Sequence, residues 1–167
     1  ALYLSTNINL PSDFSLKAGT RYEYTNIEGN WENDTEEPFS KNYDNILPNL
    51  TFSKKLSMGK SFKLSYSSRI SRPSSSYINT NTNITNNKNI TVGNPDLIPS
   101  TTKQLEFGYN SFGRKYQGSY YVYYKQSDDL IESFLRIQDD ISITTYENIG
   151  SSTSLGFNYY GSIRFNK

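Results

Sequence analysis

The sequence predicts an all-β protein, an antiparallel up-and-down meander of about seven or eight strands. Two observations carry this prediction. Apolar and polar residues alternate with period two along most of the chain, whereas helical periodicity is nearly absent. Short connections that contain Gly or Pro alternate with long polar ones. The expected strands cover 1–9, 14–25, 46–57, 61–72, 102–112, 116–137 and 141–165.

The clearest strand is 61–72, SFKLSYSSRISR, where Phe62 and Leu64 fall on one face and Lys63 and Ser65 on the other. Segments 14–25 and 102–112 repeat this pattern, and 116–137 carries tyrosines on both faces. In the last segment the alternation keeps its parity throughout. We therefore expect one long strand there, with Asn148-Ile149-Gly150 as a bulge; a turn at that position would make an eighth strand.

The connections differ in length in a regular order. Segments 10–13, 57–60, 111–114 and 138–140 are short, and Gly59 and Gly113 can supply positive φ in two of them. The connections at about 26–43 and 73–101 are long and polar. The prolines are expected outside strand interiors, with Pro48 nearest to the start of a strand.

The composition limits the function. The chain has 167 residues, enough for one domain, with 34% hydrophobic and 15% aromatic residues, which suits strands that are wet on one side. A net charge of +1 gives no reason to expect nucleic acid as a partner. With neither Cys nor His, the sequence lacks disulfides, thiolate metal ligands and the commonest general base. No apolar run is long enough for a membrane helix, and the start at Ala1 without a signal peptide suggests a mature or excised chain.

The pattern fits two architectures. Short and long connections in alternation are typical of a transmembrane β-barrel, whose periplasmic turns are short and whose outside loops are long. Most of the expected strands reach the 9–11 residues or so that a crossing needs. A soluble β-sandwich shows the same alternation of faces, so the pattern alone leaves both possibilities open.

Four motifs occur in a fixed order: RISRP at 69–73, YIN at 77–79, GNPDLIP at 93–99 and LEFGY at 105–109. This ordered set resembles the C-terminal barrel of TonB-dependent outer-membrane receptors, in particular the nutrient-uptake branch with large barrels. Further similarities extend the resemblance over nearly the whole chain: LKAGTRYEYT at 16–25, NILPNLTFSKKL at 45–56, YYVYYKQSDDLIE at 120–132 and YENIGSSTSLGFNYY at 146–160. The chain departs from the family where Ile78-Asn79-Thr80 replaces LNP, Pro99-Ser100 replaces PE, and Asn158 replaces an acidic residue.

The resemblance implies a location in the bacterial outer membrane and a role in uptake of a siderophore, glycan or peptide. Receptors of this family have a plug domain and 22 strands, so residues 1–167 would form part of the barrel wall and its extracellular mouth. The implied partners are outer-membrane lipid, the rest of the barrel and plug, and the TonB energy-transducing complex through that plug. No cofactor and no enzymatic activity are expected. The resemblance does not identify the substrate.

Several residues are candidates for a site. Trp31, Arg69 and Tyr77 are the ligand-binding candidates, and Arg69, Arg72, Pro73, Gly93, Asn94, Pro95, Asp96 and Pro99 form a structural motif. By parity, Arg69 should face the lumen, and Arg72 should point to the other face near the rim. Arg72 could meet anionic lipid head groups and Arg69 an anionic substrate; alternatively, both form rim ion pairs or bind loop carbonyls. Asp96 is expected to accept bonds from backbone N–H groups in the GNPD turn.

The long loops also admit two interpretations each. The acidic residues in and beside the loop 26–43 could bind calcium or a cationic ligand, or simply be solvated; they are Glu28, Glu32, Asp34, Glu36, Glu37 and Asp44. Trp31 could stack on a sugar or cover the loop's own small core. The asparagine-rich segment 79–94 could contact sugars or be a solvated loop. The tyrosines are expected to form an aromatic girdle.

Two other functions compete with transport. A soluble β-sandwich adhesin or carbohydrate-binding module would explain the alternation equally well. A third hypothesis, an embedded lipase or protease, is disfavoured because the chain lacks His, Cys and a GxSxG motif.

Overall fold

The computed structural model describes residues 1–29, 39–57, 59–80, 83–86 and 88–165. In these residues nine strands form one sheet in the order β1-β2-β3-β4-β7-β8-β9-β6-β5. The long strands are β1 (Leu2–Leu10), β2 (Phe14–Gly29), β3 (Phe39–Ser57), β4 (Lys60–Ser71), β7 (Ser100–Phe112), β8 (Tyr116–Gln138) and β9 (Ile141–Ile163). The connection after β4 contains α1 (Ser75–Ile78), β5 (Asn83–Asn86) and β6 (Asn89–Thr91).

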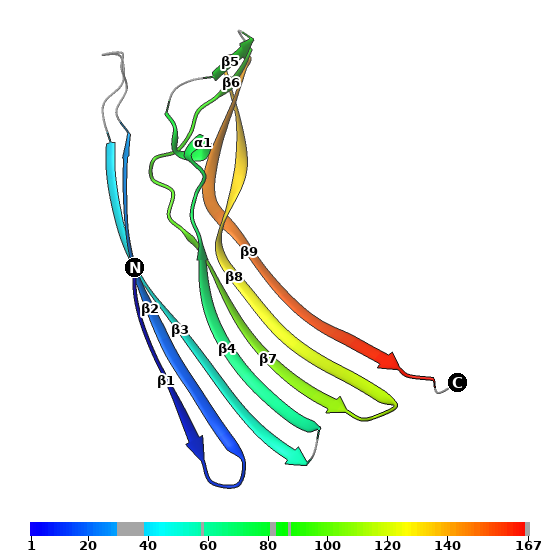
Figure 1. The fold of residues 1–167 in the computed structure, drawn as a ribbon. Coiled ribbons are helices and arrows are strands. Elements are labelled where there is room, and N and C mark those ends of the chain that lie inside the picture. Colours follow the sequence, from blue (N-terminus) through cyan, green and yellow to red (C-terminus); the bar gives the residue numbers. More distant parts are fainter. Residues whose placement is uncertain (30–38, 58, 81–82, 87, 166–167) are drawn as a thin grey trace.

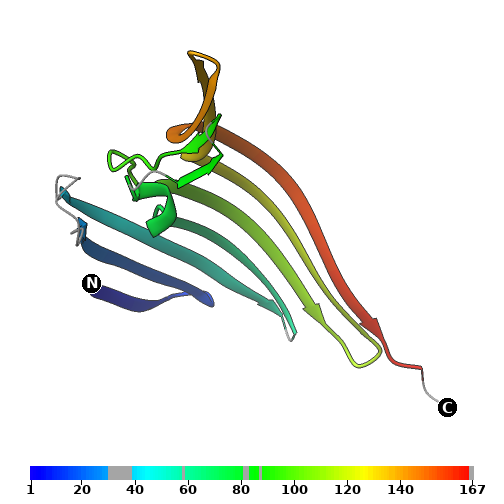
Figure 2. The ribbon, with the colours of Figure 1, turned by 90° about the horizontal axis from the view of Figure 1, so that it is seen from above.

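The sheet is a single curved wall, open between β1 and β9 (Figures 1 and 2). Every neighbouring pair is antiparallel except β6 and β9. Among the described residues no second sheet packs on this wall, and only Leu47, Ile78 and Leu97 are buried hydrophobics. A sandwich needs two sheets with a core between them. The soluble sandwich is therefore not the architecture of this chain.

The seven long strands agree with the sequence prediction, and so does the bulge in the last one. In the β8–β9 pair, Leu130 lies opposite Gly150 and Ile131 opposite Asn148, which leaves Ile149 as an extra residue. The β8 strand is irregular at the same level, where Asp129 has a φ of +57°. The hairpin closes with Asp139 and Asp140, whose φ of +50° and +62° match the type I′ turn that two-residue hairpins favour.

Both long connections are shorter than expected. Residues 26–29 and 40–43 pair as strand, so of the loop expected at 26–43 only 30–38 remains, which lies outside the described residues. The loop expected at 73–101 gives way to β7 at Ser100 and contains α1, β5 and β6. A helix of four residues and strands of three or four are too short to show a period in the sequence.

Pro48 lies inside β3, not near its start as predicted. Pairing between β3 and β4 ends at Asn49 and Ser67, so from Pro48 upward β3 pairs only with β2. Because proline has no N–H to donate, it weakens a ladder at its position and is tolerated where a strand becomes an edge. The upper part of β3 thus separates from β4, as Figure 1 shows.

The tight turns β1–β2, β3–β4 and β7–β8 lie at one end of the wall (Figure 1). Gly59 has a φ of +77°, and its carbonyl accepts a hydrogen bond of 2.6 Å from the Phe112 N–H. The connection that contains α1 lies at the opposite end. This polarity distinguishes a turn end from a loop end of the wall.

Candidate functional site

One face of the wall is apolar. Residues paired across neighbouring antiparallel strands share a face, so one ladder row can be followed through all seven long strands. One such row contains Ile8, Leu16, Phe52, Leu64, Phe107, Val122 and Phe157. Leu64, Phe107 and Phe157 are 42%, 48% and 62% exposed. Contiguous exposure of this kind marks a surface that meets an apolar environment. We call it the apolar face.

An aromatic row crosses the apolar face near the turn end. It contains Leu10, Phe14, Lys54, Phe62, Tyr109, Tyr120 and Tyr159. Phe14 stacks on Phe52 with ring centroids 5.2 Å apart, and the Lys54 ammonium lies 4.1 Å from the Phe14 centroid. Tyr120 and Tyr159 continue the row, with centroids 5.0 Å apart. Amphipathic rings in such a row suit a boundary between apolar and aqueous surroundings.

The opposite face is polar and mostly cationic. One of its rows contains Asn7, Lys17, Thr51, Ser65, Glu106, Tyr123 and Gly156. From the turn end up to Glu23, the basic residues at polar-face positions of the seven long strands are Lys17, Arg21, Lys55, Lys63, Arg69 and Lys125, against the acidic Glu23 and Glu106. The net charge of +1 for the whole chain conceals this asymmetry. We call this surface the polar face.

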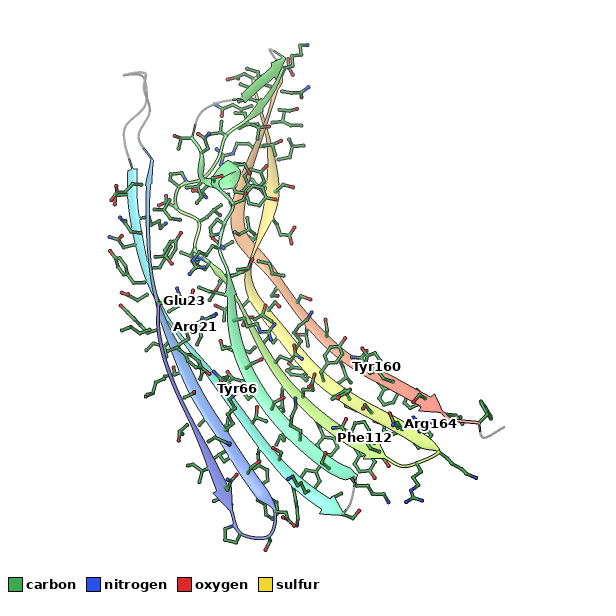
Figure 3. The ribbon with its side chains drawn as sticks, viewed as in Figure 1. Arg21, Glu23, Tyr66, Phe112, Tyr160 and Arg164 are labelled. Carbon is green, nitrogen blue, oxygen red and sulfur yellow. The ribbon has the colours of Figure 1, made fainter. Side chains whose placement is uncertain are left out.

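Glu23 is the centre of an ion-pair cluster on the polar face. Its residue is only 7% exposed, and its carboxylate lies 2.7 Å from Arg21 Nε (Figure 3). The Arg72 guanidinium pairs with the other carboxylate oxygen and also donates to Thr25 Oγ1 at 3.0 Å. Two arginines on one nearly buried carboxylate satisfy both oxygens, which a buried charge requires.

Arg72 was predicted to point to the face opposite Arg69, and this prediction is wrong. Arg69 pairs with Thr102 on the polar face as expected, but β4 ends at Ser71 and the buried Pro73 follows. Strand alternation therefore no longer sets the direction of Arg72, which turns back to Glu23 instead. Arg72 thus forms an ion pair with Glu23, whereas Arg69, for which a rim ion pair was weighed in the same way, has none in the described part of the chain.

The GNPD segment packs against α1. The Gly93 N–H donates to Asn79 O at 2.9 Å, and the Asn94 N–H donates to Tyr77 O at 2.7 Å. A Cβ added at Gly93 would lie 2.7 Å from the backbone N and C of Asn79. Only glycine allows this close approach of the two backbones. Gly93 thus fixes where the loop returns toward β7.

Within the turn, Asn94 has the role that was predicted for Asp96. Asn94 Oδ1 accepts the Asp96 N–H at 2.9 Å, and its amide donates to Tyr146 O on β9 at 2.9 Å. An asparagine that bonds its own backbone two residues on forms an Asx turn, and Pro95 fixes the φ between them. The Asp96 carboxylate is instead exposed, 3.4 Å from Lys41 Nζ on β3.

Asn148 ties the loop to the bulge in β9, and the sequence analysis gave it no role. Its side chain accepts the Ile98 N–H and donates to Ile98 O, both at 2.9 Å, and it donates to Asp129 O at 2.7 Å. The neighbouring Leu97 is 1% exposed, and Pro99 is buried. The bulge predicted at 148–150 was the signal that could have indicated a special position.

Two of the three ligand-binding candidates, Tyr77 and Arg69, lie in the part of the chain that the structure describes. Tyr77 stacks on Tyr146 with centroids 4.2 Å apart and an interplanar angle of 27°, so one face of its ring is covered. Trp31 lies outside the described residues, as do Glu32, Asp34, Glu36 and Glu37 of the acidic loop. Arg69 is exposed and has no ion pair among the described residues.

A hollow of about 380 Å³ opens on the polar face where β3 and β4 separate. Its lining includes Arg21 and Arg69, together with Tyr3, Leu47, Asn49, Ser67 and Ser68. In the described ranges no group of three or more His, Cys, Asp or Glu could hold a metal ion. No helix in the described part of the chain is long and apolar enough to span a membrane.

A single-layer wall with one apolar and one polar face, joined by short turns at one end, is a segment of a transmembrane β-barrel. The family model described as "Outer membrane protein beta-barrel family" matches residues 1–167. The chain belongs to this family, and its place is the bacterial outer membrane. The apolar face accordingly contacts lipid, and the polar face lines the lumen.

The solved structures that the chain resembles include transporters and receptors. The copper transporter OprC matches with a TM-score of 0.74 and 14% identity over 98% of this chain and 26% of its own. A mutant of the Pseudomonas aeruginosa ferric enterobactin receptor PfeA matches with 0.72 and 17%, over 94% and 23%. The FrpB iron transporter of Neisseria meningitidis matches with 0.69 and 14%, over 98% and 23%. The chain thus spans about a quarter of each of these proteins. No curated protein matches it.

Proposed function

We propose that this chain forms part of the wall and extracellular mouth of a TonB-dependent receptor that takes up a nutrient. The observation that supports this most is the two-faced wall, whose fold resembles those of a copper transporter, an iron transporter and a ferric enterobactin receptor. The ordered motifs from RISRP to LEFGY point to the same class.

In this proposal the loop end of the wall faces the outside of the cell. Near its two ends the connection after β4 is bound to the wall: Arg72 pairs with Glu23 on β2, and the Ile98 N–H donates to Asn148 on β9. A plug domain in the same receptor closes the lumen, and the TonB complex supplies the energy for opening it. The wall itself contributes passage and capture, not catalysis.

The test uses cells that carry the whole receptor. The gene is deleted and restored, and growth is measured on limiting ferric siderophores, copper, glycans and peptides, with and without an intact TonB complex. We expect one nutrient class to require both the gene and TonB. Equal growth of deleted and restored cells on every nutrient class would contradict the proposed function.

A further inference from the structure

We propose that the hollow between β3 and β4 binds an anionic group, a carboxylate or a phosphate, of the ligand that enters the lumen. The hollow is lined on its cationic side by Arg21 and Arg69. This inference rests on the proposed transport function and specifies the chemical class of its substrate.

The hollow exists because the ladder between β3 and β4 ends below it. Asn49 and Ser67 form the last pair, and Pro48 next to Asn49 has no N–H with which to extend the pairing. Above this level the two strands part, and a space of about 380 Å³ remains. This volume lies within the range of small-molecule pockets, roughly 300–1,000 Å³.

The lining offers donors and little negative charge. Arg69 is exposed and has no ion-pair partner in the described part of the chain, so its five N–H donors are not held by a carboxylate. Arg21 also lines the hollow, and it pairs with Glu23 through Nε at 2.7 Å. The Tyr3 hydroxyl, the Asn49 amide and the Ser67 hydroxyl are neutral groups that can bind further oxygens.

The surroundings strengthen the preference for an anion. Glu23 is the acidic residue beside the hollow, and Arg21 and Arg72 already neutralise it. The part of the polar face nearer the turn end has four basic strand residues and one acidic one: Lys17, Lys55, Lys63 and Lys125, and Glu106. A lumen wall lined by one sign of charge concentrates counter-charged solutes and raises their rate of entry. Arginine forks match the geometry of carboxylates and phosphates.

The test measures binding of citrate, inorganic phosphate and the uncharged glycerol to the purified whole receptor in detergent. Arg69→Gln removes the unpaired cation, Arg69→Lys keeps the charge, and Arg114→Gln removes a cation from the β7–β8 turn as the matched control. We expect citrate or phosphate to bind in a salt-dependent way and glycerol not to bind. Arg69→Gln should weaken anion binding roughly tenfold or more, Arg69→Lys less, and Arg114→Gln hardly at all.

Three results would overturn the inference. The first is no anion binding by the wild type, and the second is equal binding by Arg69→Gln and the wild type. The third is that only lipid head groups displace the bound anion, as measured with vesicles that contain or lack lipopolysaccharide. Each leaves the proposed function standing if the receptor still supports TonB-dependent growth. Loss of that growth dependence in the wild type would instead count against the proposed function itself.

Discussion

Tyrosine side chains of the polar face lie over glycines of neighbouring strands. A Cβ built on Gly108 would come within 2.8 Å of two ring carbons of Tyr121, and one on Gly156 would meet the Tyr123 ring. The Tyr121 hydroxyl then reaches Asn110 Oδ1 at 3.2 Å. Such coverage shields backbone that a glycine would leave bare. Composition alone assigned the tyrosines to a girdle, because it does not tell which strands are neighbours or in what register.

Replacing Gly108 by Val should displace the Tyr121 ring, because a branched side chain would occupy the space that the ring now fills. We expect a loss of about 1–3 kcal/mol in stability, as for overpacked cores. The measurement is the temperature at which the folded whole receptor converts to its unfolded gel band. Gln104→Val, four residues away on the same face of β7, is the control. Similar conversion temperatures for both variants would contradict the prediction.

The Glu23 cluster should hold the loop more firmly than the Lys41–Asp96 pair. Glu23 is nearly buried and carries two arginines, whereas the Asp96 side chain is 92% exposed and 3.4 Å from Lys41. Glu23→Gln should therefore speed hydrogen exchange of the Asn79, Gly93 and Asn94 amides, by about tenfold if roughly 1.4 kcal/mol of anchoring is lost. Lys41→Gln should change exchange little, since exposed pairs contribute about 0–1 kcal/mol. Equal effects of the two variants would show that Glu23 does not anchor the loop.

At the scale of elements, the alternation of apolar and polar residues predicted the seven long strands. It did not predict where the pairing between β3 and β4 ends. Each strand of the sequence shows its faces through period two, and this holds even for the bulged β9. The contacts of the β4–β7 connection could not be predicted in this way. Asn148, Tyr146 and Glu23 lie far from the loop in sequence, and the loop itself has no period. Pro48 was the one local signal for the separation of β3 from β4.

The role of Pro48 can be tested by Pro48→Thr, which restores an N–H and introduces a residue that favours strands. We expect the β3–β4 ladder to extend upward, so that amides of residues 68–71 exchange more slowly and anion access to the hollow falls. Pro11→Thr, in the β1–β2 turn, is the control for loss of a proline. If the amide exchange rates at 68–71 are unchanged, β3 and β4 separate for another reason, such as the ion pair between Arg72 and Glu23.

At the scale of the whole molecule, both edges of the wall call for partner strands. In the part of the chain that the structure describes, β1 pairs with β2 alone, and β9 has β6 beside it at residues 142–144. In the hydrocarbon region each unpaired N–H or C=O costs several kcal/mol. The edges are therefore places where further strands of a closed barrel would pair. This expectation suits a chain that spans 23% to 26% of the barrel proteins described above.

The tilt of the strands can be derived from the positions at which the apolar face ends on different strands. The apolar band ends at Tyr24 on β2, because the next residues on the same face are the polar Asn26 and Glu28. On β9 it ends at Leu155, because the next residues on that face are the polar Thr153 and Ser151. Leu155 shares its ladder row with Ala18, six residues before Tyr24 on β2. Six residues extend about 20 Å, and five strand spacings about 24 Å. A level apolar band then requires a strand tilt of about 40°, within the range of outer-membrane barrels.

Because the strands are tilted, two residues in the same ladder row are expected to lie at different depths in the membrane. This segment has no cysteine, so Tyr24→Cys, Ala18→Cys and Leu155→Cys each add one site for a fluorophore to it, in a whole receptor whose other cysteines are replaced. Quenching by lipids brominated at known depths should place labels 24 and 155 at the same level. Label 18, in the same row as 155, should lie about 15 Å deeper, since 20 Å along a strand tilted by 40° spans that height. Equal depths for labels 18 and 155 would mean that the strands stand upright, and the wall would then not fit a tilted barrel.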